Sequence, residues 1–228
     1  MNRGDYGLDA AKIQQFKSGL LAWFTDKRRD FYWRSAGACT YTKVVSEVLL
    51  QRTQAPVVSN FLPTFISAFP SWNAIAESDE EEVGDVLRPL GLWRRRAKAL
   101  VALAGDLSRR EGYWPADRHE LETMPAVGQY VASAVLMFEH GVAAPLMDAS
   151  MARVIRRYFE VLPEKADIRY DKPLQALANA VVDDPAAVQL NWAILDFAAL
   201  QCKKAKPECE TCPLQEGCVY FARMRELG

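Results

Sequence analysis

The chain has 228 residues, half of them hydrophobic, so it can bury one large core or two smaller ones. A formal net charge of −1 excludes a generally basic protein, and any site for a polyanion must therefore depend on a local patch of charge. No apolar run approaches the roughly 20 residues that span a membrane, and Met1 to Ala10 lacks the apolar core of a signal peptide. We expect a cytoplasmic protein without a membrane partner.

Apolar residues recur at helical spacing through most of the chain, and strand patterns are almost absent. Residues 10–27, for example, place Ile13, Phe16, Leu20 and Phe24 on one face. Further helices are expected over residues 42–52, 56–68, 71–77, 79–88, 93–110, 117–123, 129–140, 149–158, 171–182 and 187–200. The sequence therefore predicts an all-α fold with short connections.

Two groups of basic residues fall on these expected helices: Arg94, Arg95 and Arg96 with Lys98, and Arg153, Arg156 and Arg157. Each group could contact phosphates through charge-assisted hydrogen bonds. A solvated helix face is the more ordinary interpretation of such a run. The two interpretations stay open at this point.

The segment from Leu121 to Ala132 joins two expected helices through a tight turn that contains Pro125 and Gly128. Such a turn leaves backbone N–H groups open at the start of the second helix, where the helix dipole also favours an anion. These donors suit a phosphate oxygen and need no charged side chain. The pattern is consistent with a grip on a nucleic-acid backbone, although any helix–turn–helix connection can use proline and glycine.

Two carboxylates stand out by their position. Asp148 comes just before the expected helix at 149–158, where aspartate is a favoured N-cap, and that structural role alone would explain it. Glu47 lies in the apolar stretch from Val44 to Leu50, where an unpaired carboxylate would be costly. It is either an ordinary solvent-facing glutamate or a buried one with a raised pKa.

Four cysteines near the C-terminal end have the spacing Cys-x6-Cys-x2-Cys-x5-Cys: Cys202, Cys209, Cys212 and Cys218. A zinc ribbon usually has two separated Cys-x2-Cys pairs, whereas here one pair is flanked by two single cysteines. This spacing favours a 4Fe-4S cluster with four thiolate ligands, and a structural zinc ion is the alternative. A disulfide framework is disfavoured because the fifth cysteine, Cys39, has no partner and no secretory signal opens the chain.

The segment Met124 to Tyr130, followed by Asp148 and then by the four cysteines, resembles the helix-hairpin-helix DNA glycosylases of the endonuclease III and MutY superfamily. The resemblance covers about Phe31 to Tyr220, and its further motifs are Tyr32 to Arg34, Ser46 to Gln54, Leu90 to Leu92 and Asn191 to Phe197. It implies a two-lobed, all-α fold. A helical barrel domain would span 31–143 and include the hairpin at about 121–135, and a cluster domain would comprise 1–30 with 144–228 and hold the cluster loop 202–218.

Position 130 separates the chemistries within that superfamily. Members similar to endonuclease III have a lysine there that forms a Schiff base with the sugar and permits strand cleavage, whereas this chain has Tyr130. The resemblance is greatest to the Mig-type mismatch glycosylases, which implies a monofunctional enzyme of base excision repair that removes thymine or uracil opposite guanine. The alternatives are a MutY-like adenine glycosylase, a glycosylase for another damaged base, and a catalytically silent DNA-binding iron-sulfur protein. The hairpin departs from the family pattern at Ala126, where glycine is usual, and at Val131, where threonine is common.

The resemblance also implies residue roles. Asp148 would stabilise the positive charge on the sugar and orient the attacking water, Glu47 would assist the departing base, and Tyr130 would line the base pocket. The expected DNA contacts are Gln51, Arg52 and Leu92 around the orphan base and Ala126, Val127, Gly128 and Gln129 in the hairpin. The cysteine-bound 4Fe-4S cluster would hold the C-terminal loop without taking part in hydrolysis. The expected partner is double-stranded DNA with a mismatched or damaged base, bound by a nucleoid-associated monomer.

Overall fold

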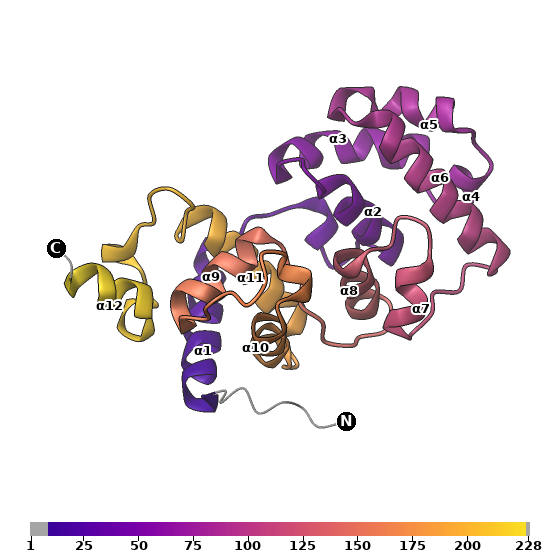
Figure 1. Cartoon of the computed structure of the whole chain (residues 1–228). Coiled ribbons are helices and arrows are strands. Elements are labelled where there is room, and N and C mark those ends of the chain that lie inside the picture. Colours follow the sequence, from indigo (N-terminus) through magenta and orange to yellow (C-terminus); the bar gives the residue numbers. More distant parts are fainter. Residues whose placement is uncertain (1–8, 227–228) are drawn as a thin grey trace. The chain divides into compact units, whose positions relative to one another are not determined.

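The computed structural model describes residues 9–226, which form helices and connecting loops without a β-strand (Figure 1). The prediction of an all-α fold is confirmed. The chain divides into two compact units. We call Asp30–Val142 the middle unit, and Met1–Arg29 with Ala143–Gly228 the terminal unit. Within residues 9–226 no helix has the length and apolar character required to cross a membrane.

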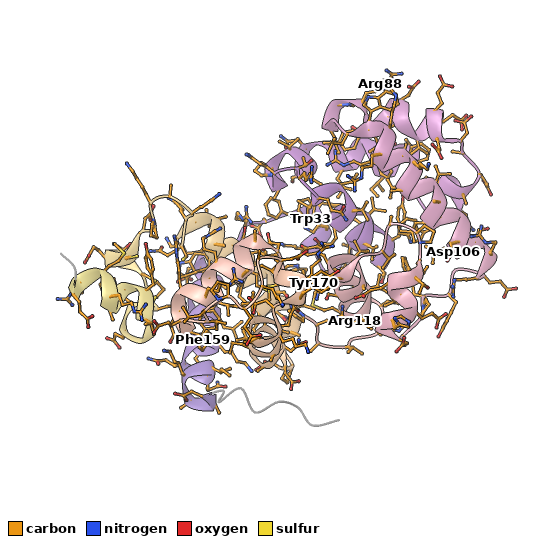
Figure 2. The ribbon with its side chains drawn as sticks, in the orientation of Figure 1. Trp33, Arg88, Asp106, Arg118, Phe159 and Tyr170 are labelled. Atoms are coloured by element: carbon orange, nitrogen blue, oxygen red, sulfur yellow. The ribbon has the colours of Figure 1, made fainter. Side chains whose placement is uncertain are left out.

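The middle unit consists of seven α-helices and two short 3-10 turns. These elements are η1 (Tyr32–Arg34), α2 (Thr40–Leu50), α3 (Ala55–Ala68), α4 (Trp72–Ala76), α5 (Glu80–Leu87), η2 (Arg88–Leu90), α6 (Trp93–Arg109), α7 (Arg118–Thr123) and α8 (Gln129–Phe138). Helices α4 and α5 pack on α6, and α2 packs on α8. Trp33, labelled in Figure 2, is buried and stacks on Phe31 with 4.6 Å between the ring centroids. Each of the helices expected in this part of the chain is present.

A capping box begins α5. The Oδ1 atom of Asp79 accepts from the backbone N–H groups of Glu81 and Glu82 at 2.9 and 2.8 Å, and the Glu82 carboxylate accepts from the Asp79 N–H at 3.1 Å. Farther along α5, a Cβ atom on Gly84 would come within 2.9 Å of the Trp93 ring. The glycine therefore lets α5 lie close against the first turn of α6, next to the loop that carries Leu92.

In its described part, residues 9–29 and 143–226, the terminal unit consists of α1, four later α-helices and three 3-10 turns. They are α1 (Ala10–Lys27), α9 (Ala149–Phe159), η3 (Ile168–Tyr170), α10 (Lys172–Val182), α11 (Ala187–Leu200), η4 (Cys209–Thr211), η5 (Gln215–Gly217) and α12 (Val219–Glu226). Helix α1 packs on α11, and α9 packs on α10 and α11. In this core the Phe16 ring lies 4.8 Å from the Tyr158 ring and 5.3 Å from the Phe159 ring. Helix α12 and the 3-10 turns were not expected from the sequence.

The second basic group turns inward, so neither interpretation from the sequence describes it. The guanidinium of Arg156 donates to the fully buried carboxylate of Asp171 at 2.7 Å. Arg153 donates to the carbonyl oxygens of Ala198 and Cys202 at 3.0 and 3.1 Å. These bonds fasten α9 to α10 and to the end of α11, which is the segment that leads into the cysteine loop.

Candidate functional site

A groove with a volume of about 390 Å³ lies on the middle unit, where three loops meet. One loop follows α2, one precedes α6, and the third is the turn of the α7–α8 hairpin. The groove brings together six of the seven residues that were expected to contact DNA: Gln51, Arg52, Leu92, Ala126, Val127 and Gly128. The seventh, Gln129, is next to Gly128 at the start of α8 but is not part of the groove wall.

Each of the three loops contains a non-glycine residue in the left-handed backbone region. The φ angles are 60° at Arg52, 51° at Leu92 and 61° at Ala126. Only two other non-glycine residues between positions 9 and 226, Glu111 and Glu160, share this conformation. Such positions cost roughly 1 to 3 kcal/mol each and are concentrated at sites where a ligand is held. Three of the five therefore line one groove, which supports a functional role for it.

The side chain at each of these positions is accessible. Leu92 is 52% exposed, which is unusual for a large apolar residue and leaves it open to contact with a partner. Arg52 and Ala126 are exposed as well. Ala126 occupies the position where the resemblance implies glycine, and its positive φ gives a physical reason for that preference, because glycine adopts this conformation without steric cost.

The hairpin has an open helix N-terminus. Helix α8 begins after Gly128, and no side chain caps it. Arg118, labelled in Figure 2, holds the two helices of the hairpin together: it donates to the Ser133 hydroxyl at 3.0 Å and to the Gln129 carbonyl oxygen at 3.4 Å. Because no side chain caps α8, the N–H groups of its first turn can bind a phosphate oxygen.

Glu47 and Tyr130 form a hydrogen-bonded pair between α2 and α8. The Tyr130 hydroxyl donates to the Glu47 carboxylate oxygen Oε2 at 2.8 Å. Glu47 is buried, with 2% of its surface exposed, so the interpretation of it as a solvent-facing glutamate is wrong. Because the two residues are 83 positions apart, the pairing of the hairpin helix with α2 could not be read from local spacing.

Asp148 belongs to the terminal unit, where it is the N-cap of α9. Its Oδ1 atom accepts from the backbone N–H groups of Ser150 and Met151 at 2.8 and 2.7 Å. Burial raises the pKa of the Asp148 carboxyl, and the two backbone hydrogen bonds offset part of that rise. Because Oδ1 takes both bonds, Oδ2 is not needed for the cap. The structural role expected of this residue is therefore real, and its two backbone bonds use only one of the two carboxylate oxygens.

Asn191 fixes the segment that leads to Asp148 and was not identified as a positioning residue from the sequence. Its side-chain oxygen accepts from the Leu146 N–H at 2.7 Å, and its amide donates to the carbonyl oxygens of Ala144 and Ala187 at 3.1 and 2.9 Å. Asn191 is fully buried. A single asparagine inside the apolar stretch 187–200 was the available signal, because a buried amide needs partners.

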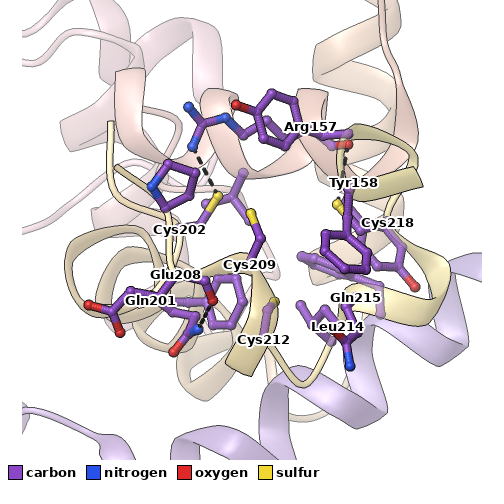
Figure 3. Close-up of a pocket in the computed structure, with 16 residues that line it drawn as sticks. Arg157, Tyr158, Gln201, Cys202, Glu208, Cys209, Cys212, Leu214, Gln215 and Cys218 are labelled. Atoms are coloured by element: carbon purple, nitrogen blue, oxygen red, sulfur yellow. Dashed lines mark hydrogen bonds between the residues drawn. The ribbon is translucent and has the colours of Figure 1, made fainter. Parts of the chain in front are cut away.

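The four cysteines of the C-terminal motif line one cavity of the terminal unit (Figure 3). Burial raises the pKa of the Cys212 thiol to about 11, and repulsion from the other thiolates adds to the effect. Arg157 donates to the Cys202 sulfur at 3.4 Å and to the Lys203 carbonyl oxygen at 2.8 Å. The donor set, four thiols on one cavity, fits a thiolate-bound centre. Within residues 9–226, however, no group of three or more histidine, cysteine or acidic residues is positioned to hold a metal ion as it stands.

Known proteins resemble this chain over nearly its whole length. Residues 45–180 match the family described as HhH-GPD superfamily base excision DNA repair protein. A thymine/uracil-DNA glycosylase of Pyrobaculum aerophilum is 34% identical over 96% of this chain and 96% of its own length. A thymine-DNA glycosylase of Aeropyrum pernix is 33% identical over 94% of this chain and 97% of its own length. The structure of a thermostable thymine-DNA glycosylase matches with a TM-score of 0.86 and 31% identity, covering 94% of this chain and all of that one.

Proposed function

Because the chain belongs to the HhH-GPD superfamily of base excision DNA repair proteins, we propose that it is a DNA glycosylase that removes thymine or uracil paired with guanine. Both relatives named above are thymine glycosylases that align with almost the full chain. The observation that carries the proposal is the groove of the middle unit, which unites the hairpin with the two loops that bear Arg52 and Leu92. The enzyme acts on double-stranded DNA as a monomer.

The groove accounts for how the protein reaches a base inside a duplex. The open N-terminus of α8 binds a phosphate through backbone N–H groups and fixes the position of the backbone without reading sequence. The exposed Leu92 side chain enters the space that the extruded nucleotide leaves, and Gln51 and Arg52 contact the orphan base. A mismatched base costs less to unstack than a paired one, which favours mismatches as substrates.

Asp148 carries the hydrolysis. As the C1′–N1 bond breaks, its electron pair goes to the base and positive charge develops on the sugar, where the carboxylate stabilises it. Water bonds to C1′ on the face that Asp148 presents and gives up a proton, and the base leaves as the N1 anion, which then takes up a proton. The Oδ2 atom, which the α9 cap does not use, is the oxygen assigned to this task.

The Glu47–Tyr130 pair prepares the pocket for the extruded base. A phenol cannot form an imine with C1′, so the reaction ends at the abasic site and leaves the strand intact. The hydrogen bond from Tyr130 to Glu47 holds the aromatic ring at a set angle, so that it stacks on the base or excludes bases of another shape.

The cysteines Cys202, Cys209, Cys212 and Cys218 hold a 4Fe-4S cluster in this proposal. The four cysteine thiolates would bind the irons of the cluster and so cross-link the C-terminal loop. The hydrolysis itself needs no electron transfer. Arg157 and Arg153 secure the same loop through its carbonyl oxygens, so the loop is attached to α9 as well. Analysis of iron, zinc and acid-labile sulfide in the purified protein distinguishes the cluster from a structural zinc ion.

A panel of labelled duplexes tests the function. The duplexes carry T:G, U:G, A:G or A:8-oxoguanine at one position and are analysed with and without hot alkali. We expect excision from T:G and U:G, with strand breakage only after alkali. Excision confined to the two adenine duplexes would establish the MutY-like alternative, and breakage without alkali would contradict the monofunctional mechanism. If the protein bound the duplexes but excised no base, the result would support the alternative of a catalytically silent DNA-binding protein.

A further inference from the structure

Arg96 connects the two loops that carry Gln51, Arg52 and Leu92. We infer that it is a positioning residue, a clamp that sets the backbone of both loops so that these side chains meet the DNA in the correct geometry. The inference deepens the proposed function and rests on it for its consequence in DNA, but the clamp itself can be tested without DNA.

The Arg96 guanidinium is bonded to both loops at once. In the loop before α6 it donates to the carbonyl oxygens of Leu90 and Gly91 at 2.9 and 2.6 Å. In the loop after α2 it donates to the carbonyl oxygen of Gln51 at 2.7 Å and to the Thr53 hydroxyl oxygen at 2.6 Å. A longer contact of 3.3 Å reaches the carbonyl oxygen of Leu49 at the end of α2. Four short hydrogen bonds thus join segments that are about 40 residues apart in sequence.

Two of these bonds fall on the peptide groups that determine the left-handed residues. Arg96 binds the carbonyl oxygen of Gln51, and the next residue is Arg52, with φ 60°. It also binds the carbonyl oxygen of Gly91, and the next residue is Leu92, with φ 51°. Because a peptide group is planar, holding its carbonyl oxygen also holds the N–H of the following residue and restricts that residue's φ. The clamp therefore stabilises the two strained positions directly.

Burial separates Arg96 from its basic neighbours. Arg96 is 6% exposed, so neither a solvated helix face nor a direct phosphate contact describes it, whereas Arg94 and Arg95 are exposed. Every oxygen that accepts from Arg96 is uncharged, so no carboxylate in the described part of the chain cancels its charge by a hydrogen bond. Removing a guanidinium from water is costly unless hydrogen bonds satisfy its donors. A buried arginine beneath two loops is therefore best explained by its several N–H donors, which can bind both loops at once.

Hydrogen exchange of the free protein tests the clamp. The variants are Arg96→Lys and Arg96→Met, and the matched control is Leu103→Ala, which removes fully buried packing from the same helix and leaves both loops bonded. In both Arg96 variants we expect the amides of Thr53 and Gly91 to exchange at least about tenfold faster, relative to core amides of α3, because the loops lose charge-assisted bonds. Leu103→Ala should leave that ratio unchanged. Unchanged ratios in the Arg96 variants would overturn the inference.

Base extrusion tests the consequence. A duplex with 2-aminopurine beside a T:G mismatch becomes more fluorescent when the protein unstacks the site. At temperatures where all variants are folded, we expect Arg96→Lys to lose this signal and the excision rate at least about tenfold, as Arg96→Met does, while Leu103→Ala keeps both. Full activity of Arg96→Lys would show that charge suffices and would contradict a geometric clamp. The remaining outcome is that the wild-type protein excises no base, while the Arg96 variants still show faster exchange in the two loops. That outcome would support the clamp and refute the proposed function.

Discussion

At the scale of single residues, Asp148 combines a structural role with the proposed catalytic one, and the two can be separated. Asparagine is as good an N-cap as aspartate, because its side-chain oxygen accepts the same bonds from Ser150 and Met151. Asp148→Asn should therefore keep α9 intact and lower the single-turnover excision rate by about 10²- to 10⁴-fold, with DNA affinity little changed. Asp148→Ala should lose the rate and also about 1 kcal/mol of unfolding free energy. An Asp148→Asn enzyme with normal turnover would remove the catalytic assignment.

The raised pKa of Asp148 makes a second prediction about the same carboxyl. A folded-state pKa above the unfolded value of 3.8 means that the folded protein binds the proton more tightly. The contribution of this group to stability therefore falls as pH rises through that window. We expect Asp148→Asn to be more stable than the wild type near about pH 7 and the difference to shrink as the pH falls towards 3.8. Urea denaturation of both proteins across this range measures it, and a constant or growing difference on acidification would contradict it.

Ala126 offers a test of backbone strain in the hairpin turn. Ala126→Gly should stabilise the protein by about 0.5 to 1 kcal/mol, since the relief of a left-handed alanine exceeds the added entropy of the unfolded chain. It should also tighten DNA binding by easing the turn around a phosphate. The control is Glu111→Gly, which relieves the same strain, at φ 55°, outside the groove. Both variants should gain stability in urea denaturation, but only Ala126→Gly should change the dissociation constant for DNA.

At the scale of elements, the cysteine loop has too little secondary structure of its own to account for its order. Only the short turns η4 and η5 lie between Cys209 and Cys218, and neither has a buried residue. Cross-linking by a bound centre would supply the order that so small a core cannot.

Replacement of one ligand tests this element. Cys209→Ser should yield protein with reduced iron and sulfide, weaker absorption near roughly 400 nm and faster proteolysis after about residue 200. Cys39→Ser is the matched control, because Cys39 is exposed and lies in the middle unit, and it should keep the wild-type spectrum and iron content. Zinc in place of iron in the wild type, or a full iron complement in Cys209→Ser, would contradict the proposed cluster.

At the scale of the whole molecule, a net charge of −1 means that DNA binding depends on local charge in the groove. Arg52 and Arg95 are the exposed cations of that groove. We expect the logarithm of the DNA association constant to fall with the logarithm of salt concentration with a slope of only about −2 to −4. Arg95→Gln should reduce the slope by about 1, whereas Arg109→Gln, whose arginine is paired with Asp106 at 2.8 Å, should not change it. Fluorescence titrations of DNA binding at several salt concentrations measure these slopes. Equal slopes for both variants would show that Arg95 does not contact a phosphate.

The sequence was sufficient for nearly all of the helices, because a helix of ten or more residues repeats its apolar positions within its own length. Helix α12 was not predicted; it has only eight residues, and none of them is buried. The order of hairpin, aspartate and cysteines was equally legible, since spacing along the chain is itself the signal. These features alone pointed to the superfamily.

The tertiary structure decided which polar groups face inward. Arg96 reaches Gln51 across 45 positions, Tyr130 reaches Glu47 across 83, and Arg156 turns to Asp171. Nothing local distinguishes the two arginines from their solvated neighbours. The left-handed turns at Arg52 and Leu92 also required the fold, because a strained φ persists only where distant atoms hold it. Hydrophobic periodicity is set by residues that are close together in the sequence. The burial of a charged side chain depends instead on distant residues that the fold packs around it.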